Sequence, residues 1–153
     1  MTTMRLAVAS DHAGFYLKGR AIEDLRKMGH EVFDLGTDSP APADYPLYAK
    51  AVAQAVLDGK VERAILICGS GAGACVAANK FKGIRAATCH DSFSARQCVE
   101  DDNVNILCLG SRVIGAELAL ELIHDYLSAN FSGAERHRRR LAEVAGFEDS
   151  FGK

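Results

Sequence analysis

Short apolar segments alternate with helical patterns along most of this chain, and this alternation constrains its fold more than any other feature. Apolar or β-branched runs lie at residues 5–10, 31–35, 63–68, 85–89 and 105–109. Each run is followed by a helical pattern of apolar residues, directly or after a loop. Strands that alternate with helices in this way form a parallel sheet covered on both faces and joined by right-handed crossovers. We therefore predict a Rossmann-like three-layer α/β/α sandwich with a five-stranded parallel sheet.

Glycine and proline indicate where the predicted helices begin and end. The first helix is expected to end near Met28, because Gly29 follows at the place where a helix C-terminal glycine belongs. Pro46 opens the next helix, a favoured position because a proline there loses no helical hydrogen bond. This helix is expected to run to residue 58, and the others to residue 79, over 93–100 and over 116–130.

Residues 131–153 differ from the single domain predicted over residues 1–130. They are polar and contain the run Arg-His-Arg-Arg-Arg at 136–140. One interpretation is a solvated C-terminal helix. The other is a helical arm whose arginines bind an anion, in this subunit or in a neighbouring one.

Length and charge exclude several classes of protein. The 153 residues suffice for one domain with a substantial core. A formal charge of −2 gives no overall reason to expect a nucleic acid or an anionic membrane as partner. The first ten residues lack the basic start and long apolar run of a secretion signal, and no apolar stretch approaches the roughly 18–20 residues that cross a bilayer. We expect a cytoplasmic protein.

Five cysteines lie at positions 68, 75, 89, 98 and 108. Their odd number, the absence of C-x-x-C spacing and the lack of an accompanying histidine cluster argue against a disulfide framework and a structural zinc site. We predict no bound metal, and we expect most of these thiols to be small core residues. His30 and His124 are expected at the surface.

Polar and glycine-rich residues follow the predicted strands, at the end of a parallel sheet where ligands bind. The glycines of residues 68–73 (CGSGAG) allow a tight turn and expose N–H groups that suit a phosphate or an oxyanion. This loop does not match G-x-G-x-x-G cleanly, lacks the Walker lysine and has no ribose-binding acid at the expected distance. A dinucleotide cofactor is therefore disfavoured. The other segments after strands are DHAG at 11–14, CHDS at 89–92 and GSR at 110–112.

Cys68 ends the third predicted strand and faces the glycine loop. Near the N-terminus of a helix, a thiol should lose its proton more readily than an ordinary cysteine. Position alone leaves open whether Cys68 is such a reactive thiol or simply the last buried residue of the strand.

Five ordered motifs cover nearly the whole chain: DHAGF at 11–15, DYP-x-YA at 44–49, ILICGSGAG at 65–73, AANKFKGIRA at 77–86 and LGSRVIG at 109–115. Together they resemble the ribose-5-phosphate isomerase type B family, which includes the galactose-6-phosphate isomerase subunits. The resemblance implies a cofactor-independent aldose–ketose isomerase that converts a sugar phosphate, foremost ribose 5-phosphate, through a cis-enediolate. It also implies a homodimer, or a homotetramer made of two dimers.

The resemblance implies roles for individual residues. One branch of the family uses the cysteine of its CG[ST]G motif as the base, which is Cys68 here; another uses a glutamate six residues later, where this chain has Ala74. The implied catalytic residues are Asp11, Cys68, Ser70, His90 and Asp101. The implied substrate-binding residues are His12, Tyr45, Gly69, Gly71, Ala72, Gly73, Asp102, Arg112, Arg136 and Arg140.

Within these sets, Ser70 and the N–H groups of residues 71–73 would stabilise the enediolate. His12 would bind the phosphate with Arg136 and Arg140, which come from the partner subunit. Arg112 resembles a further family residue near this site, and a structural ion pair is an equally expected role for it.

One position departs from the family pattern. Members active on ribose 5-phosphate usually carry a ring-opening histidine on the helix after the fourth strand, where this chain has Asp101. Three hypotheses follow. Asp101 or His90 opens the ring of ribose 5-phosphate; or the substrate is another sugar phosphate, such as erythrulose 4-phosphate, allose 6-phosphate or galactose 6-phosphate; or the chain is a non-enzymatic module that binds anions. Asp11, Cys68 and the intact glycine loop argue against the last.

Overall fold

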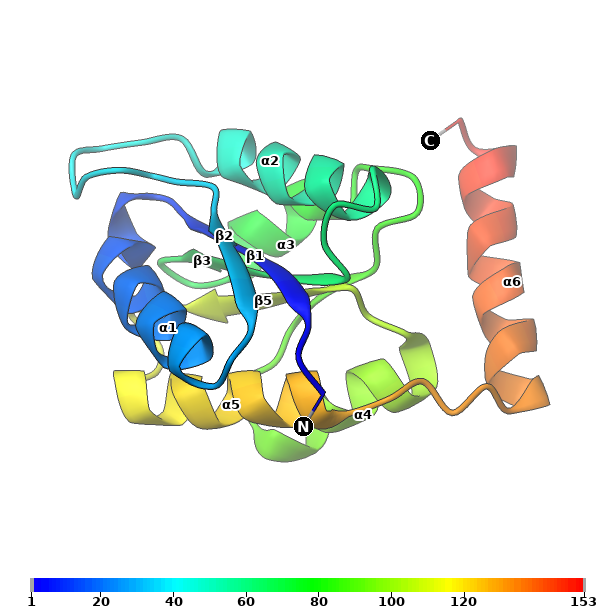
Figure 1. The fold of residues 1–153 in the computed structure, drawn as a ribbon. Coiled ribbons are helices and arrows are strands. Elements are labelled where there is room, and N and C mark those ends of the chain that lie inside the picture. The colour runs from blue at the N-terminus through cyan, green and yellow to red at the C-terminus, as the bar shows by residue number, and fades with distance from the viewer. Residues whose placement is uncertain (1, 153) are drawn as a thin grey trace.

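The strands are built from nearly continuous apolar sequence, as a parallel sheet covered on both faces requires. The computed structural model describes residues 2–152 and confirms the predicted α/β architecture (Figure 1). Every neighbouring pair of strands is parallel, and the strand order is β2-β1-β3-β5-β4. The strands are β1 (Arg5–Ser10), β2 (Glu31–Asp34), β3 (Arg63–Cys68), β4 (Ala86–Thr88) and β5 (Ile106–Gly110).

The helices form two layers on the sheet and one separate arm. Helices α1, α4 and α5 bury their apolar sides on one face, and α2 and α3 on the other. Among residues 2–152, no helix has both the length and the apolar composition to span a bilayer. The helices are α1 (Phe15–Lys27), α2 (Tyr45–Leu57), α3 (Ala72–Ala78), α4 (Ser92–Asp102), α5 (Ala116–Ser128) and α6 (Glu135–Ser150), with a short 3-10 turn, η1 (His12–Gly14), before α1.

Side chains of the central strand β3 alternate between the two helical layers. Ile65 and Ile67 pack in the core with α1, α4 and α5, while Leu66 and Cys68 pack in the core with α2 and α3. This period of two places the sulfur of Cys68 on the side of α2 and α3. The second core contains many alanines, whose small side chains let both helices approach the sheet closely.

The order of the strands creates a switch point between β1 and β3. The chain leaves β1 toward β2 on one side, and later resumes at β3 on the other side of β1. In open α/β sheets the connections diverge at such a point and leave a crevice at the carboxyl ends of the strands. Asp11 follows β1 directly and Cys68 ends β3, so the two residues flank this crevice.

Several element boundaries differ from the predictions by a residue or two. Strand β4 is shorter than predicted because the backbone N–H of Arg85 bonds the side chain of Asn105 instead of a strand carbonyl. Helix α1 begins only at Phe15, because the carboxylate of Asp11 first caps the turn η1. Helix α2 begins at Tyr45, one residue before the predicted proline.

The prediction that His30 lies at the surface is wrong. Its side chain is buried, and its Nδ1 accepts the backbone N–H of Met4 at 3.0 Å. Burial lowers the pKa of His30, because the charged ring would lose its hydration there. His124, also expected at the surface, is half-buried, with its Nε2 2.6 Å from a carboxylate oxygen of Asp24.

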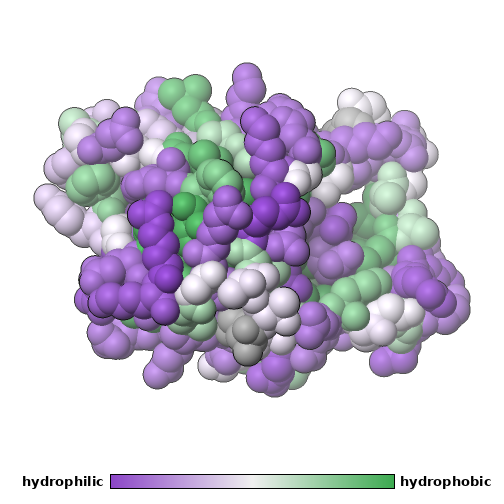
Figure 2. Space-filling view, in the orientation of Figure 1, coloured by the Kyte–Doolittle hydropathy of each residue, from purple (hydrophilic) through white to green (hydrophobic). Residues whose placement is uncertain are grey.

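Helix α6 stands apart from the sandwich (Figure 1). Between α6 and the β4 edge of the sheet lies a cavity of about 800 Å³, which we call the arm groove. Hydrophobic residues gather on the side of α6 that faces the domain (Figure 2). The apolar residues that line the arm groove are Ile84, Ala86, Ala87, Val104, Leu141, Val144, Phe147 and Phe151.

Candidate active site

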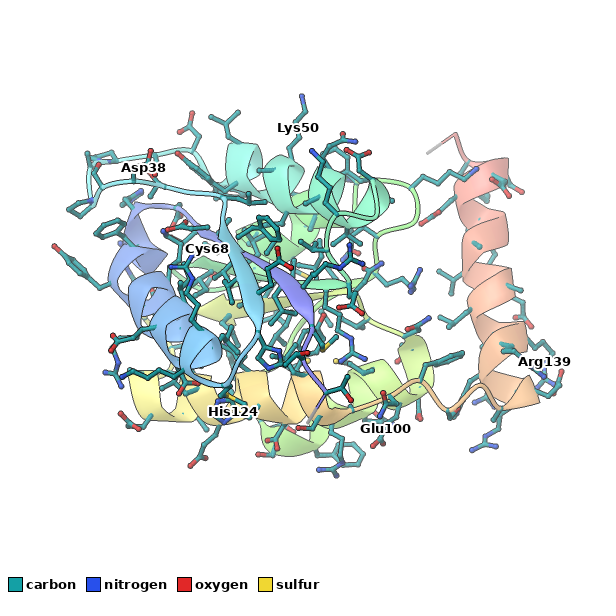
Figure 3. The ribbon with its side chains drawn as sticks, viewed as in Figure 1. Asp38, Lys50, Cys68, Glu100, His124 and Arg139 are labelled. Atoms are coloured by element: carbon teal, nitrogen blue, oxygen red, sulfur yellow. The ribbon has the colours of Figure 1, made fainter. Side chains whose placement is uncertain are left out.

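A pocket of about 360 Å³ opens at the carboxyl ends of β1 and β3, at the switch point. It is smaller than the arm groove, but it gathers the polar residues that follow these strands. Figure 3 labels Cys68 here, far from the arm α6. The residues that line the pocket are Asp11, Tyr45, Cys68, Gly69, Ser70, Gly73, Arg112 and Val113.

The sulfur of Cys68 is held by the loop that follows it. The backbone N–H of Gly71 donates to Cys68 Sγ at 3.2 Å. This hydrogen bond fixes the sulfur beside the glycine loop, where Cys68 lines the pocket. The turn depends on glycine, because Gly71 has a φ of 83° and a Cβ there would lie 2.9 Å from Thr88 Cγ2.

A second glycine lets a tyrosine reach the pocket. The ring of Tyr45, in the first turn of α2, lies against the backbone of Gly73 in the first turn of α3. A Cβ on Gly73 would lie 2.9 Å from two atoms of this ring. The phenol of Tyr45 therefore forms a wall of the pocket only because residue 73 has no side chain.

The glycine loop uses two of its own N–H groups. The N–H of Gly71 bonds Cys68 Sγ, and the N–H of Ala72 donates to Ser70 Oγ at 3.1 Å. This differs from the expectation that all three N–H groups of residues 71–73 are available to a substrate. Within residues 2–152, the N–H of Gly73 is the one that no protein acceptor takes.

Asp11 and His12 are fixed by local hydrogen bonds. Asp11 Oδ1 accepts the N–H groups of Ala13 at 3.0 Å and Gly14 at 3.3 Å, so the carboxylate caps the turn η1 while it lines the pocket. His12 Nδ1 accepts the N–H of Ala43 at 3.1 Å. His12 Nδ1 also lies 3.2 Å from the carbonyl oxygen of Ala43, so Ala43 fixes the ring through Nδ1.

Arg112 lies beside the glycine loop. Its backbone N–H donates to the carbonyl of Gly69 at 3.0 Å, and its Nη1 lies 3.3 Å from the position of a Cβ on Gly69. Among residues 2–152, the ion pairs do not include Arg112. Its positive charge is therefore unpaired at the rim of the pocket.

His90 follows strand β4, at the same end of the sheet as the pocket, but it does not line the pocket. Its Nε2 accepts the backbone N–H of Gly110 at 2.9 Å, which ties the end of β4 to the end of β5. This bond occupies Nε2 with a structural partner.

Asp101 and Asp102 do not meet Cys68 within one chain. Helix α4 runs back from the carboxyl end of β4 to the amino end of β5, so its last residues lie at the opposite end of the sheet. Asp101 bonds the amide of Gln97 at 3.0 Å and lies 3.5 Å from His137 Nε2. Asp102 lines the arm groove.

The arginines of the arm are also distant from the pocket of their own chain. Arg136 and Arg140 lie on α6, and both are exposed. Figure 3 labels Arg139 on this helix and Cys68 on the other side of the molecule. Within a single chain, the predicted site residues therefore fall into two groups at two ends of the domain.

Cys75 is a titratable group that the sequence does not single out. Hydrogen bonding from Cys108 lowers the pKa of Cys75 to about 6, against the opposing effect of burial. Its Sγ lies 3.5 Å from the carbonyl of Ala86, and it does not line the pocket. The other four cysteines are buried, as expected for core residues. Among residues 2–152, no group of three His, Cys, Asp or Glu side chains is placed to hold a metal ion.

The pocket combines groups suited to proton transfer on a small anionic molecule. Cys68 can gain and lose a proton, the carboxylate of Asp11 and the phenol of Tyr45 can bond hydroxyl groups, and Arg112 adds positive charge. A volume of about 360 Å³ fits a substrate of a few carbon atoms.

Comparisons with known proteins agree with this chemistry. The family model described as Ribose/Galactose Isomerase matches residues 6–144. The chain is 43% identical over 144 residues to ribose-5-phosphate isomerase B of Escherichia coli, covering 94% of this chain and 96% of that protein. It is 42% identical over 131 residues to D-erythrulose-4-phosphate isomerase of Pectobacterium atrosepticum, covering 85% and 86%. A solved structure of ribose-5-phosphate isomerase B from Clostridium thermocellum matches with a TM-score of 0.95 and 42% identity, covering 97% of this chain and 100% of that one.

The geometry at Gly71 generates a stability prediction. We expect Gly71→Ala to lower the free energy of unfolding by about 1–3 kcal/mol, because alanine is strained at this φ and its Cβ meets Thr88. Gly19→Ala is the control: Gly19 lies within α1 with nothing within 4 Å of its Cβ position, so we expect a gain of roughly 0.5–1 kcal/mol. Urea unfolding measures both. Equal stability of the two variants would show that the loop does not need a left-handed residue.

Proposed function

This chain belongs to the ribose/galactose isomerase family, and we propose that it interconverts ribose 5-phosphate and ribulose 5-phosphate with Cys68 as the base. The family match confirms the resemblance carried by the five sequence motifs, and the chain is a sugar phosphate isomerase. The observation that supports our choice of base is the position of Cys68 in the pocket, with a backbone N–H on its sulfur.

In the proposed reaction, one proton moves between neighbouring carbons. The thiolate of Cys68 removes the proton from the carbon beside the carbonyl, which gives a cis-enediolate. The thiol then returns a proton to the former carbonyl carbon, while a hydroxyl proton passes between the two oxygens. The product is the ketose with the same atoms, so no electron acceptor is required.

The negative charge of the enediolate needs donors that are already in place. The free N–H of Gly73 and the guanidinium of Arg112 lie at the same pocket as Cys68, and we assign them this role together with Ser70. Asp11 and Tyr45 are placed to bond the hydroxyl groups of the sugar. Because Asp11 is held by two N–H groups, it can orient a hydroxyl without moving itself.

We propose that the phosphate is bound by His12 and by the arm of a second copy of the chain. Nε2 of His12, the ring nitrogen that does not contact Ala43, is the group assigned to the phosphate. Arg136 and Arg140 are four residues apart on α6, so their side chains share one face of the helix. Because these arginines are distant from the pocket of their own chain, only a second copy can present them there.

The surface of the arm supports a dimer in which the arms are exchanged. Val144 and Phe147 of α6, and Phe151 just after it, line the arm groove and are 48%, 62% and 81% accessible. A second copy seated in the arm groove would bury them, and a two-fold axis would bring each arm to the pocket of the other chain. We therefore propose a homodimer as the smallest active unit, with a homotetramer as a larger assembly of the same dimers.

One observation favours a second candidate substrate, D-erythrulose 4-phosphate. A residue that opens a furanose ring has to donate a proton to the ring oxygen, whereas Asp101 accepts a hydrogen bond from Gln97 and lies close to His137. A tetrose 4-phosphate needs no such donor, because its phosphate occupies the oxygen that would close the furanose ring. The match to D-erythrulose-4-phosphate isomerase agrees with this alternative.

A comparison of substrates tests the proposed function. We expect kcat/KM to be highest for ribose 5-phosphate among ribose 5-phosphate, erythrose 4-phosphate, allose 6-phosphate and galactose 6-phosphate. A higher value for erythrose 4-phosphate would replace the proposed substrate by the second candidate. No turnover of any of the four would contradict the proposed aldose–ketose chemistry.

Removal of the thiol tests the proposed base. We expect Cys68→Ala to lower kcat by roughly 10²–10⁴-fold, the usual contribution of a positioned acid–base group. Cys75→Ala is the matched control, since Cys75 has a lowered pKa but does not line the pocket, and it should keep most of the wild-type kcat. Steady-state kinetics measure kcat for both variants. A kcat of Cys68→Ala within threefold of that of Cys75→Ala would contradict the assignment of Cys68 as the base.

Removal of the arm arginines tests the proposed phosphate contact. We expect Arg136→Ala and Arg140→Ala each to raise KM by roughly tenfold or more, because a hydrogen bond to a charged group contributes about 1.5–3 kcal/mol. Arg138→Ala is the control on the same helix, since Arg138 points to a different side of α6. Unchanged KM values in the first two variants would exclude the arm from substrate binding.

A further inference from the structure

The root of the arm contains a buried histidine that the proposed chemistry does not use. His137 is 6% exposed and is the one buried residue of α6, which otherwise carries exposed or half-buried side chains. Its Nδ1 lies 2.6 Å from Ser132 Oγ, and its Nε2 lies 3.5 Å from Asp101 Oδ1. A buried imidazole with a partner at each nitrogen joins three segments: the end of α4, the connection after α5 and the first turn of α6.

Ser132 links the imidazole of His137 to the backbone on both sides of the arm root. Ser132 Oγ lies 2.6 Å from His137 Nδ1 and accepts the N–H of Ala134 at 3.1 Å. The backbone N–H of Ser132 donates to the carbonyl of Glu100 at 3.0 Å, which fixes the serine to the end of α4.

Asp101 is also held from its own helix. Its Oδ2 accepts from the amide of Gln97 at 3.0 Å, one turn earlier in α4. The carboxylate that faces His137 is therefore fixed on a rigid element. We call Ser132, His137 and Asp101 the arm lock.

The arm has few other ties to its own domain. At its far end, Lys82 pairs with Asp149, and the N–H of Gly83 donates to Glu148 at 3.2 Å. Both side chains of the ion pair are mostly exposed, so water and salt screen it. Between the two ends lies the arm groove, so the arm lock sets the position of the first turns of α6.

We propose that His137 is a positioning residue for substrate binding, which acts through the arm lock. Arg136 is its sequence neighbour, and Arg140 follows within one turn of the same helix. A shift of the buried ring therefore moves both guanidinium groups together. This inference rests on the proposed function, because it assigns the lock to the arginines that reach the phosphate bound by a second copy.

Kinetics of variants separate positioning from a merely structural role. We expect His137→Ala and Ser132→Ala to raise KM roughly tenfold while kcat at saturating substrate changes less than about threefold. Ser132→Thr keeps the hydroxyl and should retain the wild-type KM. A loss of kcat with an unchanged KM in the alanine variants would overturn the proposal.

A double-mutant cycle identifies the path of the effect. If the lock acts through the arginines, His137→Ala should add less than about twofold to KM in an Arg136→Ala/Arg140→Ala background, although it adds about tenfold alone. Full additivity would mean that His137 acts independently of the arm and would also overturn the proposal.

Amide hydrogen exchange tests the lock separately from the reaction. Ser132→Ala should speed exchange in residues 129–145 relative to Ser132→Thr, and leave the strands of the sheet unchanged. Hydrogen exchange can be measured even if the wild-type protein converts none of the four sugar phosphates. That result would contradict the proposed function but not the role of Ser132 and His137 in holding the arm. Equal exchange rates in the two variants would contradict the proposal that the arm lock holds the first turns of α6.

Discussion

Burial of β3 on both faces is the constraint on which the pocket depends. Ile65 and Ile67 have to face one helical layer, and Leu66 and Cys68 the other, so the strand cannot slip by one residue without exchanging the two layers. This register brings Cys68 to the carboxyl end of the sheet, between β1 and β5. There the left-handed Gly71 can turn its N–H onto the sulfur, so the position of the proposed base follows from core packing.

The same topology separates the proposed site residues into two groups at opposite ends of one chain. Strands that run parallel place Cys68 at one end of the sheet, while α4 returns to the other end and leaves Asp101 beside the root of the arm. A single chain therefore holds a pocket with its base at one end and a set of exposed arginines at the other. In our proposal, the apolar inner side of α6 and the arm groove supply the association energy, and the arginines supply the phosphate contact.

Much of this arrangement could be predicted from the sequence. The apolar runs gave the five strands, and the glycines after Cys68 indicated the loop at the pocket. Contacts between distant segments could not be predicted, because no local pattern encodes them. Buried His30 accepts a hydrogen bond from the N–H of Met4, which is distant in the sequence. Asp101 contacts His137 because the arm returns to the end of α4. The N–H of Ala72 is likewise taken by Ser70, which only the folded loop reveals.

The division of the site between two chains is tested most directly by mixing two defective variants. Cys68→Ala lacks the base but keeps the arm, and the double variant Arg136→Ala/Arg140→Ala keeps the base but lacks the arm contacts. After unfolding and refolding together in equal amounts, half of the dimers contain one of each, and each mixed dimer has one complete pocket. Our account predicts recovery of about a quarter of the wild-type rate at low substrate concentration. A rate no higher than the mean of the two variants measured separately would contradict it.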